Sequence, residues 1–359
     1  MRFTNSMNEL FYSDIFDQAE AVKATRAYLS NSVSPQLANK VIRRVIFSGA
    51  GDSYFAGYAL QYAARFYQSR EVQILMSNES AQYWDFREGD LLIPISVSGE
   101  SKKTIQTAMK AEESGAMILP ITSHPDSSLA EITSEIVLIP HQSVTRRTPH
   151  STDYSTTLTA IAAIIEALHG KKIPELDLIE SLVEQVLLTL ENHGERFAVV
   201  DGTKGVNMIG GGPSFGTAQY GAAKFWEAGG SKSVAFEVEE VGHGPYMSFR
   251  ENELVVLIAP EGKSSEKAQY VLRGLKTLGF EVLVLTNIPD KYSTEQIIPL
   301  PTISELWSPF LTCIPLQYLC YRYANDQEIE VSEHTRFDPV TAQKAFSFFR
   351  GTDYSELYK

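Results

Sequence analysis

A strand, a glycine-rich turn and a helix follow one another twice along this chain of 359 residues. In the first copy an apolar run ends at Gly49-Ala50-Gly51-Asp52-Ser53, and in the second copy another ends at Gly210-Gly211-Gly212-Pro213-Ser214. Each turn is followed, after a similar interval, by a further glycine between an apolar run and a helical pattern, at Gly99 and at Gly262. A regular spacing that recurs indicates a duplicated unit, so we expect two related α/β units.

Between these turns, short β-branched runs alternate with helical patterns. This alternation predicts a parallel sheet with helices on both faces. The expected strands are residues 45–48, 73–76, 91–95, 117–121 and 136–139, then 206–209, 233–237, 254–259, 281–285 and 297–300. The expected helices are residues 54–67, 102–114, 154–169, 176–192, 215–228, 266–278 and 306–324, with a short one near Leu129 and an amphipathic helical lead-in over residues 1–39.

Composition excludes several classes of protein. The net charge of -13 argues against nucleic-acid binding, which needs clustered Lys and Arg. No apolar run has the length of about 18 residues that a membrane span requires, and the N-terminus lacks a signal-peptide pattern, so we expect a cytoplasmic protein. Cys313 and Cys320 lie seven apart in an apolar helical stretch and are expected to be reduced core residues.

The segment from Ser96 to Ser101 indicates a phosphate site. Three serines, Ser96, Ser98 and Ser101, fall within six residues, after an apolar run and at the start of a helical pattern. One serine would suffice as a helix cap. Lys102 and Lys103 begin the helix at the end where the macrodipole disfavours cations, and a bound phosphate would offset that cost.

Glu227 and His243 are a candidate acid/base pair. His243 lies between two glycines and before Pro245, which favours a loop on which the ring can reach substrate. Lys224 and Glu227, three apart on a helix, would by themselves be an ordinary solvated ion pair.

A further hydroxyl cluster begins at Ser151 and Thr152, just before a long helix. Helix capping explains either hydroxyl alone. Arg146 and Arg147 precede it and could pair with an anionic substrate or with the acidic surface of the protein. The cluster could therefore be a helix cap or part of a substrate site.

The glycine-rich turn at residues 49–53 does not indicate a nucleotide cofactor. Tyr54 occupies the third glycine position of a dinucleotide fingerprint, and the Gly-Lys-Ser/Thr of a P-loop is missing. We therefore expect no cofactor and assign no metal ligand.

Together these segments resemble the sugar isomerase (SIS) domain family. The chain is most similar to the isomerase half of glucosamine-6-phosphate synthase and to its stand-alone relatives, fructosamine-6-phosphate deglycases and glucosamine-6-phosphate deaminases, from about residue 40 to the C-terminus. The resemblance implies two tandem SIS domains, each a five-stranded parallel sheet flanked by helices in a flavodoxin-like three-layer sandwich. It divides the chain into a helical lead-in at 1–40, a phosphate-binding domain at 41–170, a domain with the catalytic Glu and His at 171–330, and a tail at 331–359 that reaches the active site.

The family also implies roles for single residues. Glu227 matches the carboxylate that moves a proton between C1 and C2, and His243 the ring-opening histidine, usually given by the other subunit of a homodimer. Lys344 loosely matches a C-terminal lysine that forms a Schiff base. Lys224 would lie beside the sugar, or would form the Schiff base in place of Lys344. The phosphate-binding residues would be Ser53, Ser96, Ser98 and Ser101, and Ser151 would lie near the sugar.

Departures from the synthase pattern narrow the expected function. The chain has no cysteine before Cys313 to act as a glutaminase nucleophile, and Asp52 stands where a small hydroxylic residue is usual. We expect an enzyme that acts at C1 and C2 of a 6-phosphosugar amine, as a deglycase or deaminase without glutaminase activity. The alternatives are a plain ketose/aldose phosphosugar isomerase and a non-catalytic sugar-phosphate sensor. The expected partners are a phosphosugar and a second copy of the chain, not nucleic acid or a membrane.

Overall fold

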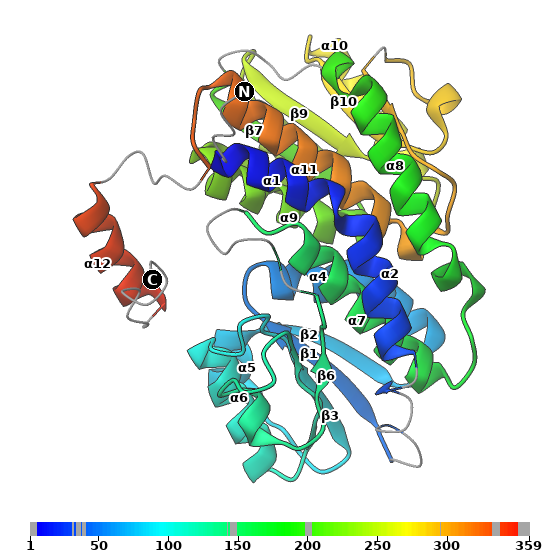
Figure 1. Cartoon of the computed structure of the whole chain (residues 1–359). Helices are drawn as coiled ribbons and strands as arrows, with labels where there is room; N and C mark the ends of the chain where they lie inside the picture. The colour runs from blue at the N-terminus through cyan, green and yellow to red at the C-terminus, as the bar shows by residue number, and fades with distance from the viewer. Residues whose placement is uncertain are drawn as a thin grey trace.

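The computed structural model of the chain describes residues 6–30, 32–33, 37, 41–141, 143, 149–197, 203–294, 296–331 and 338–350. In this part of the chain, no helix has both the length and the apolar character needed to span a membrane. Two parallel sheets form the framework, as the sequence predicts (Figure 1).

The first sheet has the strand order β2-β1-β3-β4, and β5 and β6 pair in a separate two-stranded parallel sheet, so the five-stranded sheet expected for this unit is divided. Its strands are β1 (Arg44–Gly49), β2 (Glu71–Met76), β3 (Asp90–Pro94), β4 (Met117–Ile118), β5 (Ile121–Thr122) and β6 (Val137–Leu138). The expected strand at 117–121 is thus divided. The register of β3 with β4, and the bridge from Ile95 to Ile121, bring Pro94 opposite Pro120. Neither proline has an N–H to donate, so the ladder is interrupted there.

The second sheet repeats this order. Its strands are β7 (Gly205–Gly210), β8 (Lys232–Glu237), β9 (Glu253–Ile258), β10 (Val282–Thr286) and β11 (Ile297–Pro299), in the order β11-β10-β9-β7-β8. In each sheet the first strand lies between the second and the third, and the fourth lies beyond the third. The equal topology confirms the duplication that the repeated glycine turns predict.

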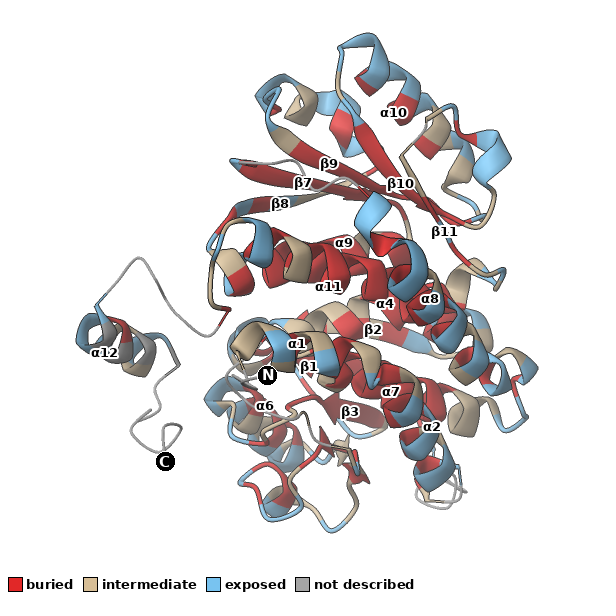
Figure 2. Cartoon of the chain, turned by 45° about the horizontal axis from the view of Figure 1, so that its top comes forward, coloured by how far each residue is buried: buried red, intermediate tan, exposed pale blue. Residues whose placement is uncertain are grey.

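Helices lie between the two sheets and on their outer faces (Figures 1 and 2). The middle layer holds α4 (Asp52–Tyr67), α7 (Thr152–His169), α9 (Pro213–Gly229) and α11 (Pro309–Asp326). On the outer faces lie α5 (Ser77–Tyr83) and α6 (Lys102–Glu113) against the first sheet, and α10 (Ser265–Thr277) against the second. The largest apolar cluster fills the middle layer and reaches both sheets, which holds the two units together.

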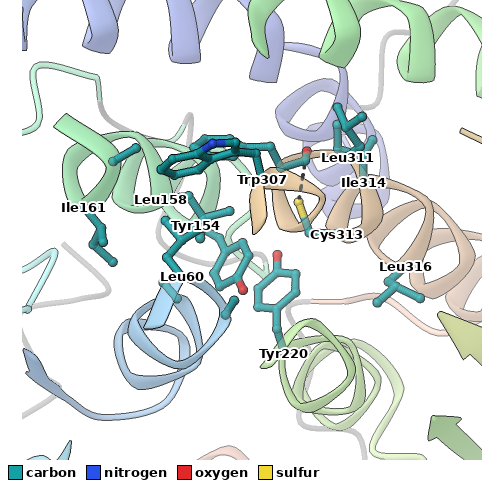
Figure 3. Close-up of a cluster of buried hydrophobic side chains, with 14 of the residues drawn as sticks. Leu60, Tyr154, Leu158, Ile161, Tyr220, Trp307, Leu311, Cys313, Ile314 and Leu316 are labelled. Carbon is teal, nitrogen blue, oxygen red and sulfur yellow. Dashed lines mark hydrogen bonds between the residues drawn. The ribbon is translucent and has the colours of Figure 1, made fainter. Parts of the chain in front are cut away.

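Large aromatic side chains pack in this middle layer (Figure 3). The rings of Tyr154 from α7 and Tyr220 from α9 are stacked, with centroids 3.6 Å apart. Trp307 is fully buried nearby. Cys313 and Cys320 on α11 are both buried and free, which confirms the prediction of reduced core cysteines.

The amino-terminal helices α1 (Met7–Phe16) and α2 (Gln18–Leu29) confirm the helical lead-in where the structure describes it. The helix α8 (Ile179–His193) lies beside α2 and α11. The sequence does not predict two of the described helices, α5 and α12 (Pro339–Arg350). The short helix α5 carries few apolar residues, so its sequence lacks the periodic pattern by which helices are recognised.

The helix α1 also completes the start of α7. One carboxylate oxygen of Asp14, Oδ2, accepts the backbone N–H groups of Ser151 (2.7 Å) and Thr152 (3.2 Å), and Oδ1 accepts the Thr152 hydroxyl (2.7 Å). Asp14 is almost fully buried. A carboxylate from a distant segment therefore caps α7, and its negative charge lies where the helix macrodipole favours an anion.

Replacing Asp14 by alanine is expected to lower the free energy of unfolding by about 2 to 4 kcal/mol, because three buried donors lose a charged acceptor. Urea unfolding at pH 7 measures the change. Asp17→Ala is the matched control, since Asp17 is exposed and makes no side-chain cap hydrogen bond to α2. Equal stability of the Asp14 variant and the control would show that the buried cap contributes nothing.

Candidate functional site

The two glycine-rich turns have the same backbone conformation. Gly51 has φ 56° and ψ -130°, and Gly212 has φ 56° and ψ -128°. Positive φ values of this kind favour glycine. Each turn joins the inner strand of its sheet, β1 or β7, to a helix of the middle layer, α4 or α9. Ser53 therefore lies in the first turn of α4, at the carboxyl end of β1, where ligands bind in open α/β sheets.

The helices α4 and α9 cross in close contact. A Cβ atom added at Gly216 on α9 would lie 2.6 Å from the backbone nitrogen of Ala59 on α4. Only glycine fits at that distance, so the two backbones approach more closely than ordinary helix packing allows. This contact brings side chains of the first unit against side chains of the second.

Lys224 is the centre of a cluster at this junction. Its Nζ atom on α9 lies 2.6 Å from Oδ2 of Asp52 on α4 and 2.6 Å from Oε2 of Glu227. The Lys224 side chain is 0% exposed, whereas the side chains of Asp52 and Glu227 are 28% and 45% exposed. Lys224 also lies over the ring of Tyr220, 5.1 Å from its centroid. The Lys–Glu pair is therefore not the solvated pair that helical spacing alone suggests.

The mutual attraction and repulsion of these charges set the protonation states of the cluster. Burial by itself would lower the pKa of Lys224, but Asp52 and Glu227 outweigh it and raise the pKa above its ordinary value. Burial raises the pKa of Asp52 to about 6; Lys224 opposes the rise, and the charge of Glu227 adds to it. Lys224 is therefore an ammonium at neutral pH, and one positive charge is shared by two carboxylates. A nitrogen held in this form cannot attack a carbonyl to form an imine.

The seryl segment lies at the start of α6 with its hydroxyls close together. Ser96 is buried, and its hydroxyl donates to Oγ of Ser101 (3.1 Å) while it accepts from the backbone N–H of Gly99 (3.1 Å). Ser101 is the N-cap residue of α6, but its side chain makes no capping hydrogen bond. The first N–H groups of α6 thus have no side-chain cap there, which suits an anion at this helix end.

A neighbouring loop braces the seryl segment. The carboxylate of Glu100 accepts the backbone N–H (2.9 Å) and the hydroxyl (2.7 Å) of Ser128. The carbonyl oxygen of Val97 accepts the hydroxyls of Thr122 and Ser123. These bonds fix the backbone of the segment before any ligand arrives, which lowers the entropy cost of binding.

In the second unit, a carboxylate of the protein occupies the corresponding place. The backbone N–H of Lys263 donates to Glu305 (3.0 Å), and a Cβ atom at Gly262 would collide with that carboxylate at 2.1 Å. Before α6, a Cβ atom at Gly99 would instead meet the hydroxyl of Ser127 at 2.0 Å, so a neutral group lies there where the second unit has a carboxylate. Glu261, in the same turn as Gly262, adds a second carboxylate that would repel an anion. Both acidic residues disfavour a phosphate at this turn of the second unit.

Comparison with known proteins agrees with this arrangement. Residues 40–167 and 203–305 match the model of the SIS domain. The chain belongs to the SIS domain family. It is 26% identical over 329 residues to the isomerizing glutamine–fructose-6-phosphate aminotransferase of Aquifex aeolicus (strain VF5), an alignment that covers 89% of this chain and 55% of that protein. The chain thus spans about half the length of the curated relatives it matches.

Solved SIS structures share the fold. The C-terminal domain of glucosamine-fructose-6-phosphate aminotransferase from Francisella tularensis superposes with a TM-score of 0.82 at 20% identity, over 90% of this chain and 97% of that one. Glucosamine-6-phosphate deaminase from Thermotoga maritima gives a TM-score of 0.75 at 19% identity, over 90% and 96%. The predicted tandem SIS fold is therefore confirmed.

The other predicted site residues of this SIS chain lie outside the Lys224 cluster. Ser151 is fully buried, and its backbone N–H is bonded to Asp14. The ring of His243 is 63% exposed, and its Nε2 lies 3.3 Å from Oε1 of Glu239. Lys344 is exposed on α12, which stands apart from the two sheets (Figure 1). Within one chain, the structure does not join these residues to the Lys224 cluster; Arg146 and Arg147 lie outside the described residues.

Asp52 is not among the site residues that the sequence predicts, although its departure from the family pattern narrows the expected substrate. Its only signal is an acidic residue in the glycine-rich turn, at a position where SIS relatives are expected to have a small hydroxylic one. The contact with Lys224 joins residues that are far apart in the sequence and on different units, so no local pattern could predict it.

Proposed function

We propose that this SIS protein is an enzyme that acts at C1 and C2 of an open-chain 6-phosphosugar bearing an amine, as a deglycase or deaminase. Ser53, Ser96, Ser98 and Ser101 would bind the phosphate in the first unit. Glu227 of the second unit would transfer the proton between C1 and C2 through an enediol or enaminol. The junction of α4 and α9 supports this division, because it holds Glu227 next to the turn that carries Ser53.

The observation that carries the proposal is the charge of the Lys224 cluster. Two carboxylates, Asp52 and Glu227, share a single ammonium, so the cluster keeps about one excess negative charge above the pH at which Asp52 ionises. Such a charge favours a cationic ammonium or iminium group on the substrate over a neutral hydroxyl. It therefore favours an amine-bearing phosphosugar over the substrate of a plain isomerase.

Ring opening would be the task of His243. In this proposal the histidine comes from the other subunit of a homodimer, since within one chain its ring bonds to Glu239 and is largely exposed. Lys344 on α12 stays the proposed imine-forming residue, because the charge on Lys224 removes that residue from the role.

The proposal predicts turnover of amine-bearing phosphosugars. The test compares fructosamine 6-phosphates and glucosamine 6-phosphate with fructose 6-phosphate, with release of amine or ammonia and of hexose phosphate as the readout. We expect kcat/KM for at least one amine substrate to exceed that for fructose 6-phosphate at least tenfold, roughly the effect of one charge interaction of 1.4 kcal/mol. Equal or faster isomerisation of the amine-free sugar would show a plain isomerase, and binding without any turnover would show a sensor.

A further inference from the structure

In the chemistry proposed above, Asp52 contributes negative charge to the cluster but transfers no proton, yet it is bound tightly to Lys224. Its Oδ2 atom lies 2.6 Å from Nζ of Lys224. The other oxygen, Oδ1, is shielded from solvent and has no hydrogen-bond partner among the described residues. A buried carboxylate oxygen without a partner is costly, so a protein that keeps one requires an explanation.

The geometry allows Asp52 to act on Glu227 without touching it. Both carboxylates bind one nitrogen atom, so they compete for its positive charge, and their own negative charges repel each other. In a simple Lys–Glu pair, the whole charge of the lysine would stabilise the glutamate and weaken it as a base. A second carboxylate draws part of that stabilisation away.

We propose that Asp52 is a positioning residue, which acts through Lys224: it holds the ammonium charged and in place, and it keeps Glu227 a stronger base than a simple Lys–Glu pair would. The inference rests on the proposed proton transfer by Glu227. It also gives a reason for the departure at this position, because a small hydroxylic residue carries no charge to compete with Glu227.

The other titratable groups around the cluster come from several elements. Tyr220 lies on α9, Tyr154 on α7, Cys320 on α11 and His150 just before α7. Burial raises the pKa of Tyr220, Tyr154 and Cys320, so these three stay neutral between pH 5 and about 8. His150 lies near the cluster, and a positive charge on its ring lowers the pKa of Asp52. His150→Gln therefore belongs in the test as a separate variant.

The test is the pH profile of kcat for Asp52→Asn and Asp52→Thr. We expect kcat to fall about tenfold and the acid limb of the profile to move down by about one pH unit, because Glu227 then receives the full charge of Lys224. In the His150→Gln background, adding Asp52→Asn should again move the acid limb of the pH profile to lower pH. The control Glu266→Gln removes an exposed carboxylate from the first turn of α10 and should change nothing.

The outcomes separate the two ideas. A folded Asp52 variant with lower stability but an unmoved acid limb would show a purely structural role and overturn the inference. If Asp52→Asn does not fold, Asp52→Thr carries the test, since the hydroxylic residue suits the turn. If the wild-type protein turns over no phosphosugar, the proposed function fails, and ¹⁵N NMR of the lysine side chains decides the inference. We then expect Lys224 to stay protonated above the ordinary lysine value of about 10.4, and to titrate at lower pH in Asp52→Asn; identical titration in both would overturn it.

Discussion

Glu227→Gln is expected to lower kcat by about 10²-fold to 10⁴-fold, the range that a positioned general base contributes. The substitution keeps the length of the side chain and an oxygen that can accept from Lys224, but it removes the carboxylate proposed to take the proton. The proposed phosphate site lies in the other unit, on Ser96, Ser98 and Ser101, so the Kd for a phosphosugar should change little. Steady-state kinetics and titration calorimetry measure the two effects separately.

Glu184→Gln is the matched control for this variant, because Glu184 is an exposed glutamate on α8, away from the cluster. It should keep wild-type turnover. Turnover near the wild-type rate in Glu227→Gln would remove Glu227 from the catalytic role. A large loss of phosphosugar binding would place Glu227 in ground-state binding instead.

Lys224→Met is expected to lower the free energy of unfolding by about 3 to 5 kcal/mol at pH 8, the cost of leaving one partner of a buried ion pair alone. Methionine fills a similar volume, so the loss of charge is the main change. The Asp52 carboxylate is the partner that is destabilised, because its Oδ1 atom already lacks a hydrogen-bond partner and its side chain is mostly enclosed. Urea unfolding at two pH values measures the effect.

The loss caused by Lys224→Met should be smaller at pH 5 than at pH 8. The pKa of Asp52 is raised from 3.8 to about 6 in the folded protein, so the stability linked to this carboxyl falls as pH rises through that window. Without Lys224 the pKa rises further, and at pH 5 a protonated Asp52 needs no cation. Lys23→Met, which breaks an exposed pair with Glu180, should have little effect at either pH. A pH-independent loss in Lys224→Met would attribute the effect to packing.

Local patterns were sufficient for the elements and their order. Short β-branched runs and periodic helices predicted both sheets, and the repeated turns at Gly51 and Gly212 predicted the duplication. The strand at 117–121 was predicted as continuous, because the pairing of Pro94 with Pro120 depends on the register between strands. The helix α7 starts at Thr152, two residues earlier than expected, because Asp14 caps it from another segment.

The sequence by itself determined the fold class, the family resemblance and the residue types of a phosphosugar site, since these depend on periodicity, turn chemistry and short motifs. Only the tertiary structure decided which carboxylates share Lys224, and that the carboxylate of Glu305 lies against the second loop where the hydroxyl of Ser127 lies against the first. The physical reason is that burial and charge sharing depend on distances between segments far apart in the chain. The close crossing of α4 and α9 at Gly216 sets that distance for Asp52 and Lys224, and with it the charge of the site.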